Sequence, residues 1–333
     1  MVDFVITWVD GNDEKWQQEK QKYANIENKN EKNDKSDNRV IRYRDMECLK
    51  YWFRGVEKYA PWVNKIYFVT CGQVPEWLNT NNEKIVLVNH QDYISKEYLP
   101  TFNSNVIEAC LHKIKNLSEK FVYFNDDMFI INRVNEKDFF KNDLPCDTMA
   151  FSPIKVFPKD SFHIKVCNDL EIIIKNFDYK KCLKMNYKKY LSFKQGRYFF
   201  KTLSLIGYNQ FVGFMNFHLP IPYLKTTFEE VWNKEGKRLC NTMKYKFRNN
   251  KDSLNHWVFQ YWQFASGKFI QRKASFGNFY GINNPKIGKV LKQRKYKIIC
   301  INDVDGDYDF ENSKQNIIKS FQQKFPDKCS FEK

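Results

Sequence analysis

The sequence predicts an α/β protein in which helices flank a mainly parallel sheet. Short apolar runs typical of buried strands alternate with amphipathic helical patterns through the first half of its 333 residues. The hydrophobic content of 42% and the aromatic content of 17% suffice for a large buried core, which excludes a globally disordered chain. No linker divides the sequence, so we expect a single domain over residues 1–333.

The elements of the first half follow one another in alternating order. Apolar runs predict strands at 4–9, 66–70, 85–88, 121–124 and 128–131. Helical spacing of apolar residues, or a capping residue, predicts helices at 14–22 (capped by Asp13), 45–59 (ended by Pro61) and 106–114. This alternation favours parallel strands joined by helices, a sheet in which ligands bind beyond the carboxyl ends of the strands.

The second half is less regular. We expect helices after Thr227 and Ser253 and from Ser313, and a short strand at 298–301. Two segments depart from this pattern: the polar, low-complexity stretch 25–38 predicts a mobile surface loop, and the Lys- and aromatic-rich stretch 155–212 predicts a variable insertion.

Two adjacent carboxylates interrupt the apolar run KFVYFNDDMFII. Asp126 and Asp127, preceded by Asn125, either form a hairpin turn or hold a cation, and the segment by itself favours neither. Asp10 and the pair Asn302-Asp303 also follow apolar strands. Because hard oxygen ligands suit Mg²⁺ or Mn²⁺, three such clusters at strand ends favour a site for a divalent cation and a diphosphate, although a plain turn explains Asn302-Asp303 equally well.

Three basic or titratable residues are further candidates. Arg44, at the start of a predicted helix, suits bidentate phosphate binding, although an ion pair with Asp45 explains it equally well. His218 lies in the proline-bounded stretch FHLPIP; a lone His is more often structural than catalytic, but its pKa suits a general base. Arg248 carries no signal by itself.

Composition narrows the class of protein further. The net charge of +16 favours a polyanionic partner, either a phosphate-rich substrate, an anionic membrane or nucleic acid. The nine cysteines form no metal-binding or disulfide-like pattern and indicate reduced thiols in the cytoplasm. Phosphate-loop, dinucleotide, serine-hydrolase and zinc-protease motifs are missing. Without a signal peptide or a long apolar run, we expect a soluble or peripherally attached protein.

Several long segments together resemble the Stealth family. DFVITWVDGND and the stretches 42–79 and 99–130, the second of which ends in KFVYFNDDMFI, resemble its first two regions. FHLPIPYLKTTFEEVW and CINDVDGDYDF, with the residues that follow each, resemble its third and fourth regions in the family's order. The family comprises bacterial capsular polysaccharide phosphotransferases related to the lysosomal-enzyme N-acetylglucosamine-1-phosphotransferase of animals.

The resemblance implies a glycosyltransferase-A-like core with a helical insertion, and a specific reaction. A sugar 1-phosphate would pass from a nucleotide sugar, such as a UDP-hexose or UDP-N-acetylhexosamine, to a hydroxyl of a polysaccharide or lipid-linked oligosaccharide, with Mg²⁺ or Mn²⁺ as cofactor and without nucleic acid. A cytoplasmic site near the inner membrane face would suit that acceptor. Cys71 departs from the family pattern, and the segment 154–213 fits it loosely, which puts the acceptor in doubt.

Carried over by position, the resemblance assigns roles to polar residues of each region. It implies substrate contacts, several of them in the nucleotide-sugar pocket, at Asp3, Trp8, Asp10, Asp13, Arg44, Asp45, Asn103, Glu108, Asn302 and Asp303. It implies metal ligands at Asp126 and Asp127 and catalytic roles for Asp127, His218 and Arg248. Either His218 or an aspartate would be the base. The alternatives are a metal-dependent glycosyltransferase that releases UDP and, from another class, a basic nucleic-acid-binding protein.

Overall fold

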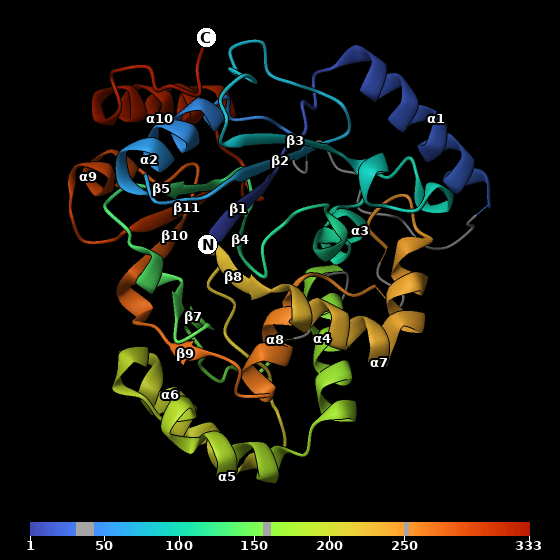
Figure 1. The fold of residues 1–333 in the computed structure, drawn as a ribbon, viewed down its shortest axis with the longest axis vertical. Coiled ribbons are helices and arrows are strands. Elements are labelled where there is room, and N and C mark those ends of the chain that lie inside the picture. The colour runs from blue at the N-terminus through green and yellow to red at the C-terminus, as the bar shows by residue number, and fades with distance from the viewer. Residues whose placement is uncertain (31–42, 156–160, 250–252) are drawn as a thin grey trace.

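The centre of the molecule is a five-stranded sheet with the strand order β3-β2-β1-β4-β8 (Figure 1). The computed structural model describes residues 1–30, 43–155, 161–249 and 253–333. The strands are β1 (Val2–Thr7), β2 (Ile66–Thr70), β3 (Ile85–Asn89), β4 (Lys120–Phe124) and β8 (Ile221–Leu224). Only β8 runs antiparallel to its neighbour. The predicted α/β class with a mainly parallel sheet is confirmed.

Two small sheets extend this core. The first has the order β10-β11-β5, with β5 (Met128–Ile130), β10 (Gly277–Gly281) and β11 (Ile298–Asn302), and the second combines β6 (Phe140–Lys141), β7 (Leu144–Asp147) and β9 (Ile270–Gln271). Consecutive strands β4 and β5 pair with different partners and never with each other. The hairpin interpretation of the Asp126-Asp127 turn is therefore wrong, since the turn joins two sheets.

Both faces of the main sheet are covered by helices because the buried side chains of each strand alternate between them. Phe4 and Ile6 of β1 face the cluster built with α2 (Leu49–Tyr59) and α10 (Phe310–Lys324), near α9 (Ile287–Lys292). Val5 faces the opposite cluster, which includes residues of α3 (Ser104–Ala109), α7 (Lys225–Met243) and α8 (Trp257–Ala265). Such two-sided burial explains why the strands read as continuous apolar runs.

Several predicted helix boundaries need correction. Asp13 does cap the first helix by accepting a hydrogen bond from Trp16 N at 2.7 Å, but α1 (Glu14–Asn30) continues through the first part of the predicted loop. The remaining loop residues, 31–38, lie outside the described residues. Later helices start at Lys225, Trp257 and Phe310 instead of at the polar residues expected to cap them. For α10 the cap is Asp309, which accepts a hydrogen bond from Asn312 N.

The predicted insertion is helical over its described part. It comprises α4 (Ser161–Asn176), α5 (Tyr179–Tyr190), a 3₁₀ turn η6 (Phe193–Gln195) and α6 (Tyr198–Leu205), while residues 156–160 lie outside the described residues. α4 packs against α8 of the core. α5 and α6 lie at the bottom of Figure 1, at the end of the molecule opposite α10 and the C-terminus.

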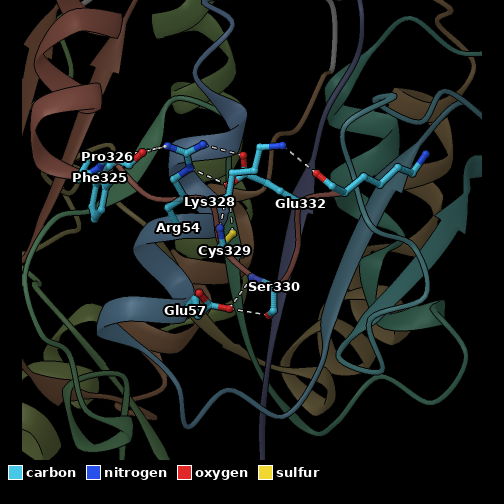
Figure 2. A network of polar contacts seen from close by, with 9 residues as sticks. Arg54, Glu57, Phe325, Pro326, Lys328, Cys329, Ser330 and Glu332 are labelled. Atoms are coloured by element: carbon cyan, nitrogen blue, oxygen red, sulfur yellow. Dashed lines mark hydrogen bonds and ion pairs between the residues drawn. The ribbon is translucent and has the colours of Figure 1, made fainter.

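The C-terminal segment is held to α2 by a partly buried ion pair (Figure 2). Arg54 donates to both carboxylate oxygens of Glu332 at 2.6 and 2.7 Å, and to the carbonyl oxygen of Phe325 at 2.7 Å. Glu57 of the same helix accepts a hydrogen bond from Ser330 N at 2.8 Å. Because bidentate arginine–carboxylate pairs are strong and directional, this clamp fixes the end of the chain against the helix that covers the main sheet.

Candidate active site

One large cavity, with a volume of about 1010 Å³, opens where β4 and β11 end. The β4–β5 turn contributes Asn125, Asp126 and Asp127 to its wall, and the end of β11 contributes Asn302 and Asp303. His218, Arg248 and Glu108 of α3 line it as well, together with residues of the insertion. The carboxyl ends of strands thus form the site, as the alternating pattern of the sequence predicts.

Asp127 is the most densely bonded acid of the cavity. Its Oδ2 accepts hydrogen bonds from Asn302 Nδ2 at 2.6 Å, from Cys300 Sγ at 3.2 Å and from His218 Nε2 at 3.3 Å. Burial would raise the pKa of this carboxyl, but the charge of His218 and these donors outweigh burial and lower it. Asp127 is therefore an anion at neutral pH.

His218 is held beside Asp127 in an uncommon backbone conformation. Its φ of 49° lies in the left-handed region that residues other than glycine seldom adopt, and such strain is concentrated at functional sites. Although burial opposes it, the charge of Asp127 raises the pKa of the imidazole. With Nε2 directed at the carboxylate, Nδ1 is the ring atom left to accept a proton.

Asp126 and Asn125 complete an oxygen-rich corner of the wall. Burial and the neighbouring charges of Asp127 and Asp45 raise the pKa of Asp126 to about 8. Asn125 Oδ1 and Asp127 Oδ1 are buried and have no hydrogen-bond partner among the described residues. Buried oxygens that lack a hydrogen-bond partner, next to a half-buried carboxyl, are the kind of ligand set that a hard divalent cation prefers.

A second possible metal-binding cluster, which contains a sulfur ligand, shares Asp127 with this corner. Ligand atoms of Asp127, His218 and Cys300 lie within 4.8 Å of one another. However, burial and the charge of Asp127 raise the pKa of Cys300 well above its ordinary value, so that the sulfur stays a thiol and donates to the carboxylate. Because Mg²⁺ and Mn²⁺ prefer oxygen ligands to sulfur, the oxygen atoms of Asn125, Asp126 and Asp127 suit either ion better than this set does.

Glu108 and Arg248 form a second polar wall. Glu108 Oε1 accepts a hydrogen bond from the Tyr123 hydroxyl at 3.1 Å, and Arg248 donates to the Ser104 hydroxyl at 2.8 Å. Burial raises the pKa of Glu108 to about 7, against the lowering influence of Arg248. Glu108 can therefore change its protonation state near neutral pH.

Arg44 and Asp45 reach the acidic corner from the other side. They line a small pocket of about 100 Å³ that shares Asp126, Asp127 and Asp303 with the large cavity. The ion pair of Arg44 is with Asp303, at 2.6 Å, and not with the adjacent Asp45 as the sequence suggested. The arginine thus lies close to the oxygen-rich corner and joins the first and last parts of the chain.

The other implied substrate residues do not line the large cavity. Asp10 accepts a hydrogen bond from Asn12 N, Asp13 caps α1, and Trp8 stacks on Phe68 next to the small pocket. Asn103 is fully buried and caps α3 while it donates to two backbone carbonyls. Asp3 lies at the opposite end of β1, where it accepts hydrogen bonds from Asn64, Lys65 and Ser118.

Further lining residues escaped the sequence analysis. They come from the insertion, from α8 and the residue before it, from β10 and from the segment before β11, and carried no motif: Lys165, Gln195, Arg197, Tyr198, His256, Trp257, Phe279 and Tyr296. Aromatic rings in a cavity wall suit stacking on a sugar or base. The aromatic and basic composition of the segment 155–212 is a feature that could have indicated some of these residues, but the spacing within the segment does not point to the cavity.

Comparison with known proteins identifies the family. The models for Stealth protein conserved regions 1 and 2 match residues 2–27 and 42–147. A capsular polysaccharide phosphotransferase, WcwK of Streptococcus pneumoniae, is 48% identical over 335 residues, covering 100% of this chain and 98% of the relative. The chain belongs to the Stealth family. It is accordingly a phosphotransferase, and the predicted resemblance is confirmed.

Other Stealth phosphotransferases match along the full chain. The receptor polysaccharide phosphotransferase WefC of Streptococcus oralis is 43% identical and covers 99% of both chains, and the exopolysaccharide phosphotransferase cps2G of Lactiplantibacillus plantarum is 36% identical and covers 100% of this chain and 96% of its own. Among solved structures, the galactosyltransferase LgtC covers 96% of this chain and 95% of its own with 12% identity and a TM-score of 0.39.

Proposed function

We propose that this enzyme transfers a sugar 1-phosphate from a nucleotide sugar, such as a UDP-hexose or UDP-N-acetylhexosamine, to a hydroxyl of a surface polysaccharide. The observation that carries the proposal is the convergence, in one cavity, of the acidic corner at Asp126 and Asp127 with His218 and Arg248. The volume of about 1010 Å³ is large enough for a nucleotide sugar and part of an acceptor. Relatives named as polysaccharide phosphotransferases support the acceptor class.

The reaction is an in-line displacement at phosphorus. The acceptor hydroxyl oxygen forms a bond to the phosphorus attached to the donor sugar, the bond from that phosphorus to the bridging oxygen breaks, and the nucleoside monophosphate leaves with the bridging oxygen. The hydroxyl proton passes to a base on the enzyme. Because the bond between the sugar C1 and its oxygen stays intact, the anomeric configuration of the donor is kept in the product.

His218 fits the role of base. Its Nε2 is fixed by Asp127 at 3.3 Å, which leaves Nδ1 free to accept the hydroxyl proton and stabilises the imidazolium that results. Arg248, and Arg44 from the adjoining pocket, supply positive charge for the phosphoryl oxygens, where negative charge accumulates in the transition state. In the alternative mechanism a carboxylate is the base and His218 binds the phosphate. Glu108, whose pKa is about 7, is the carboxyl group best suited to that role.

A divalent cation completes this assignment. Asp126, Asp127 and the Asn125 amide oxygen would hold Mg²⁺ or Mn²⁺, since two of their oxygens are buried without a partner among the described residues. When bound, the cation would neutralise the diphosphate of the donor. We expect a chelator to abolish turnover and added Mg²⁺ to restore it.

The nature of the released nucleotide tests the proposal. The enzyme is incubated with a panel of UDP-sugars, Mg²⁺ and an acceptor polysaccharide, and the products are identified by mass spectrometry. Release of UMP with a mass gain of one sugar phosphate on the acceptor is expected. Release of UDP would mean that the enzyme is a glycosyltransferase, and salt-sensitive oligonucleotide binding without any turnover would favour a nucleic-acid-binding protein instead.

A further inference from the structure

The insertion exposes an uncommon number of large apolar side chains. Among the described residues, seven of the twelve that are exposed lie between 174 and 208: Ile174, Met185, Tyr187, Phe193, Phe200, Leu203 and Tyr208. Three of them are mostly exposed to solvent: Phe193 is 83%, Phe200 73% and Met185 71% exposed. Clustered apolar groups of this kind mark an interaction site, whereas single ones are ordinary.

The exposed phenylalanines form a projecting aromatic cluster. Phe193, in the turn η6, stacks on Phe199 with ring centroids 4.6 Å apart, and Phe199 meets Phe200 edge-on at 5.5 Å. The rings therefore contact each other at the surface of α6. We call these three rings the apolar tip; they lie in η6 and at the start of α6, in the unit that α5 and α6 form at the bottom of Figure 1.

This unit is firmly attached to the core, so its exposed rings do not result from loose packing. Gln195 is fully buried and donates to the carbonyls of Met149 and Tyr190 at 2.9 and 2.8 Å. The Tyr190 hydroxyl donates to Phe264 of α8 at 2.9 Å. The backbone of Phe151 donates to the buried Thr202 hydroxyl at 3.1 Å. The helices that carry the apolar tip are thus bonded to the core of the protein.

The same unit is strongly basic. Between residues 178 and 208 the sequence carries eight cationic side chains, at Lys180, Lys181, Lys184, Lys188, Lys189, Lys194, Arg197 and Lys201. Asp178, the one acidic residue of this stretch, caps α5 by accepting a hydrogen bond from Lys181 N at 2.7 Å. Of the eight cations only Lys189 is half-buried, so seven face solvent in the same stretch of sequence as the apolar tip.

We propose that this basic aromatic surface, formed by the exposed apolar and cationic residues of 180–208, docks on an anionic phospholipid bilayer. Aromatic and apolar tips enter the region between headgroups and acyl chains, while lysines beside them contact the phosphates. A basic surface without acidic side chains complements a uniformly negative plane better than it does a protein surface of mixed charge. No helix among the described residues is long and apolar enough to cross a bilayer, so the contact is peripheral.

The position of the surface links it to catalysis, and this part of the inference depends on the proposed function. Residues Gln195 to Tyr198 line the large cavity and lie in the sequence between the exposed Phe193 and Phe200. Docking would therefore bring the cavity wall to the bilayer, where an acceptor attached to a lipid carrier presents its sugars. The enzyme would act on lipid-linked polysaccharide without leaving the membrane.

Vesicle flotation in the absence of substrate tests the docking. The wild-type enzyme should float with vesicles of equimolar phosphatidylglycerol and phosphatidylcholine and stay behind with phosphatidylcholine alone. Phe193→Ser with Phe200→Ser should weaken binding at least tenfold, because two rings lose their insertion. Lys180→Gln, Lys184→Gln and Lys188→Gln together should weaken it roughly a hundredfold, at about fivefold per lysine.

Matched variants elsewhere control for loss of charge and of apolar area. Val74→Ser with Leu87→Ser removes two exposed apolar residues, and Lys286→Gln, Lys289→Gln and Lys292→Gln at α9 remove three exposed charges. These controls should bind as the wild type does, and all variants should unfold at the wild-type urea midpoint. Equal loss in the controls, binding to neutral vesicles, or self-association in place of vesicle binding would overturn the proposal.

Turnover separates this inference from the proposed function. With a short water-soluble acceptor, the Phe193→Ser, Phe200→Ser enzyme should keep the wild-type kcat, and with a vesicle-embedded acceptor it should be at least tenfold slower. An equal rate on both acceptors would overturn the link to catalysis. If the wild-type enzyme released UDP or had no activity, the proposed function would fail while the flotation result would stand.

Discussion

The substitution Asp127→Asn distinguishes a catalytic acid from a structural one. The amide oxygen can take the place of Oδ2 and keep the bonds from His218, Asn302 and Cys300, while the NH₂ group occupies the position of Oδ1, which has no partner among the described residues. Losing the charge weakens three hydrogen bonds by about 1 kcal/mol each. Relief of the cost of burying this charge offsets a similar amount. We therefore expect the free energy of unfolding to change by less than about 2 kcal/mol.

Activity should respond far more strongly than stability. The substitution removes the carboxylate that would bind the cation and that fixes His218, the proposed base. We therefore expect kcat to fall at least about 10³-fold, which corresponds to a loss of about 4 kcal/mol of transition-state stabilisation. Steady-state UMP release and urea unfolding measure the two effects on one preparation, with the exposed Asp143→Asn as the control. Retention of more than a tenth of the wild-type kcat, or destabilisation beyond about 4 kcal/mol, would show that Asp127 is a structural residue and refute the reasoning.

Three further substitutions test the site and the fold. His218→Ala should lower kcat by about 10²–10⁴-fold, as loss of a positioned proton acceptor does, and wild-type turnover would make His218 structural. Arg54→Met should reduce the free energy of unfolding in urea by about 1–3 kcal/mol, because the partly buried carboxylate of Glu332 loses its bidentate partner; a loss as small as that of Asp143→Asn would contradict the clamp. His112→Phe should make stability less sensitive to acid. Burial lowers the pKa of His112 from 6.5 to about 3, so between these values the unfolded chain binds a proton that the folded chain does not, and stability falls with falling pH by up to about 1.4 kcal/mol per unit. Equal slopes in wild type and variant would contradict this assignment.

Features that depend on local sequence were predicted well. β2 has the predicted bounds, and β3 and β11 exceed theirs by a residue each, because buried parallel strands are continuous apolar runs with polar ends. Asn302 donates to Asp127 near the carboxyl ends of β11 and β4, where the rule for ligand sites in α/β proteins led us to expect polar clusters, although the two strands belong to different sheets.

Features that depend on distant contacts were not predictable. The partner of Arg44 is Asp303, which lies 259 positions away in the chain, so that the nearby Asp45 was the natural wrong choice. In the sequence, Cys300 is simply one residue of an apolar strand. Its contact with Asp127 arises only because β5 pairs with β11 in a second sheet.

The roles of several residues likewise depend on where they are buried, which the residue type alone does not reveal. Glu108 has a pKa near neutrality because α3 buries it beside the cavity, and no feature of its sequence neighbours indicates this. Asn103, five positions earlier, belongs to the same predicted set but serves as a helix cap and backbone donor. The insertion supplied cavity residues without any periodic signal, because its contribution depends on how α5 and α6 are attached to the core.

The fate of one phosphorus atom tests the central claim most directly. A UDP-sugar donor labelled with ³²P in the phosphate attached to the sugar is incubated with the enzyme, Mg²⁺ and acceptor polysaccharide, and the polymer is separated from the nucleotides. Sugar 1-phosphate transfer predicts that the label appears in the polysaccharide while unlabelled UMP is released. Label found in released UDP, with an unlabelled polymer, would contradict the account.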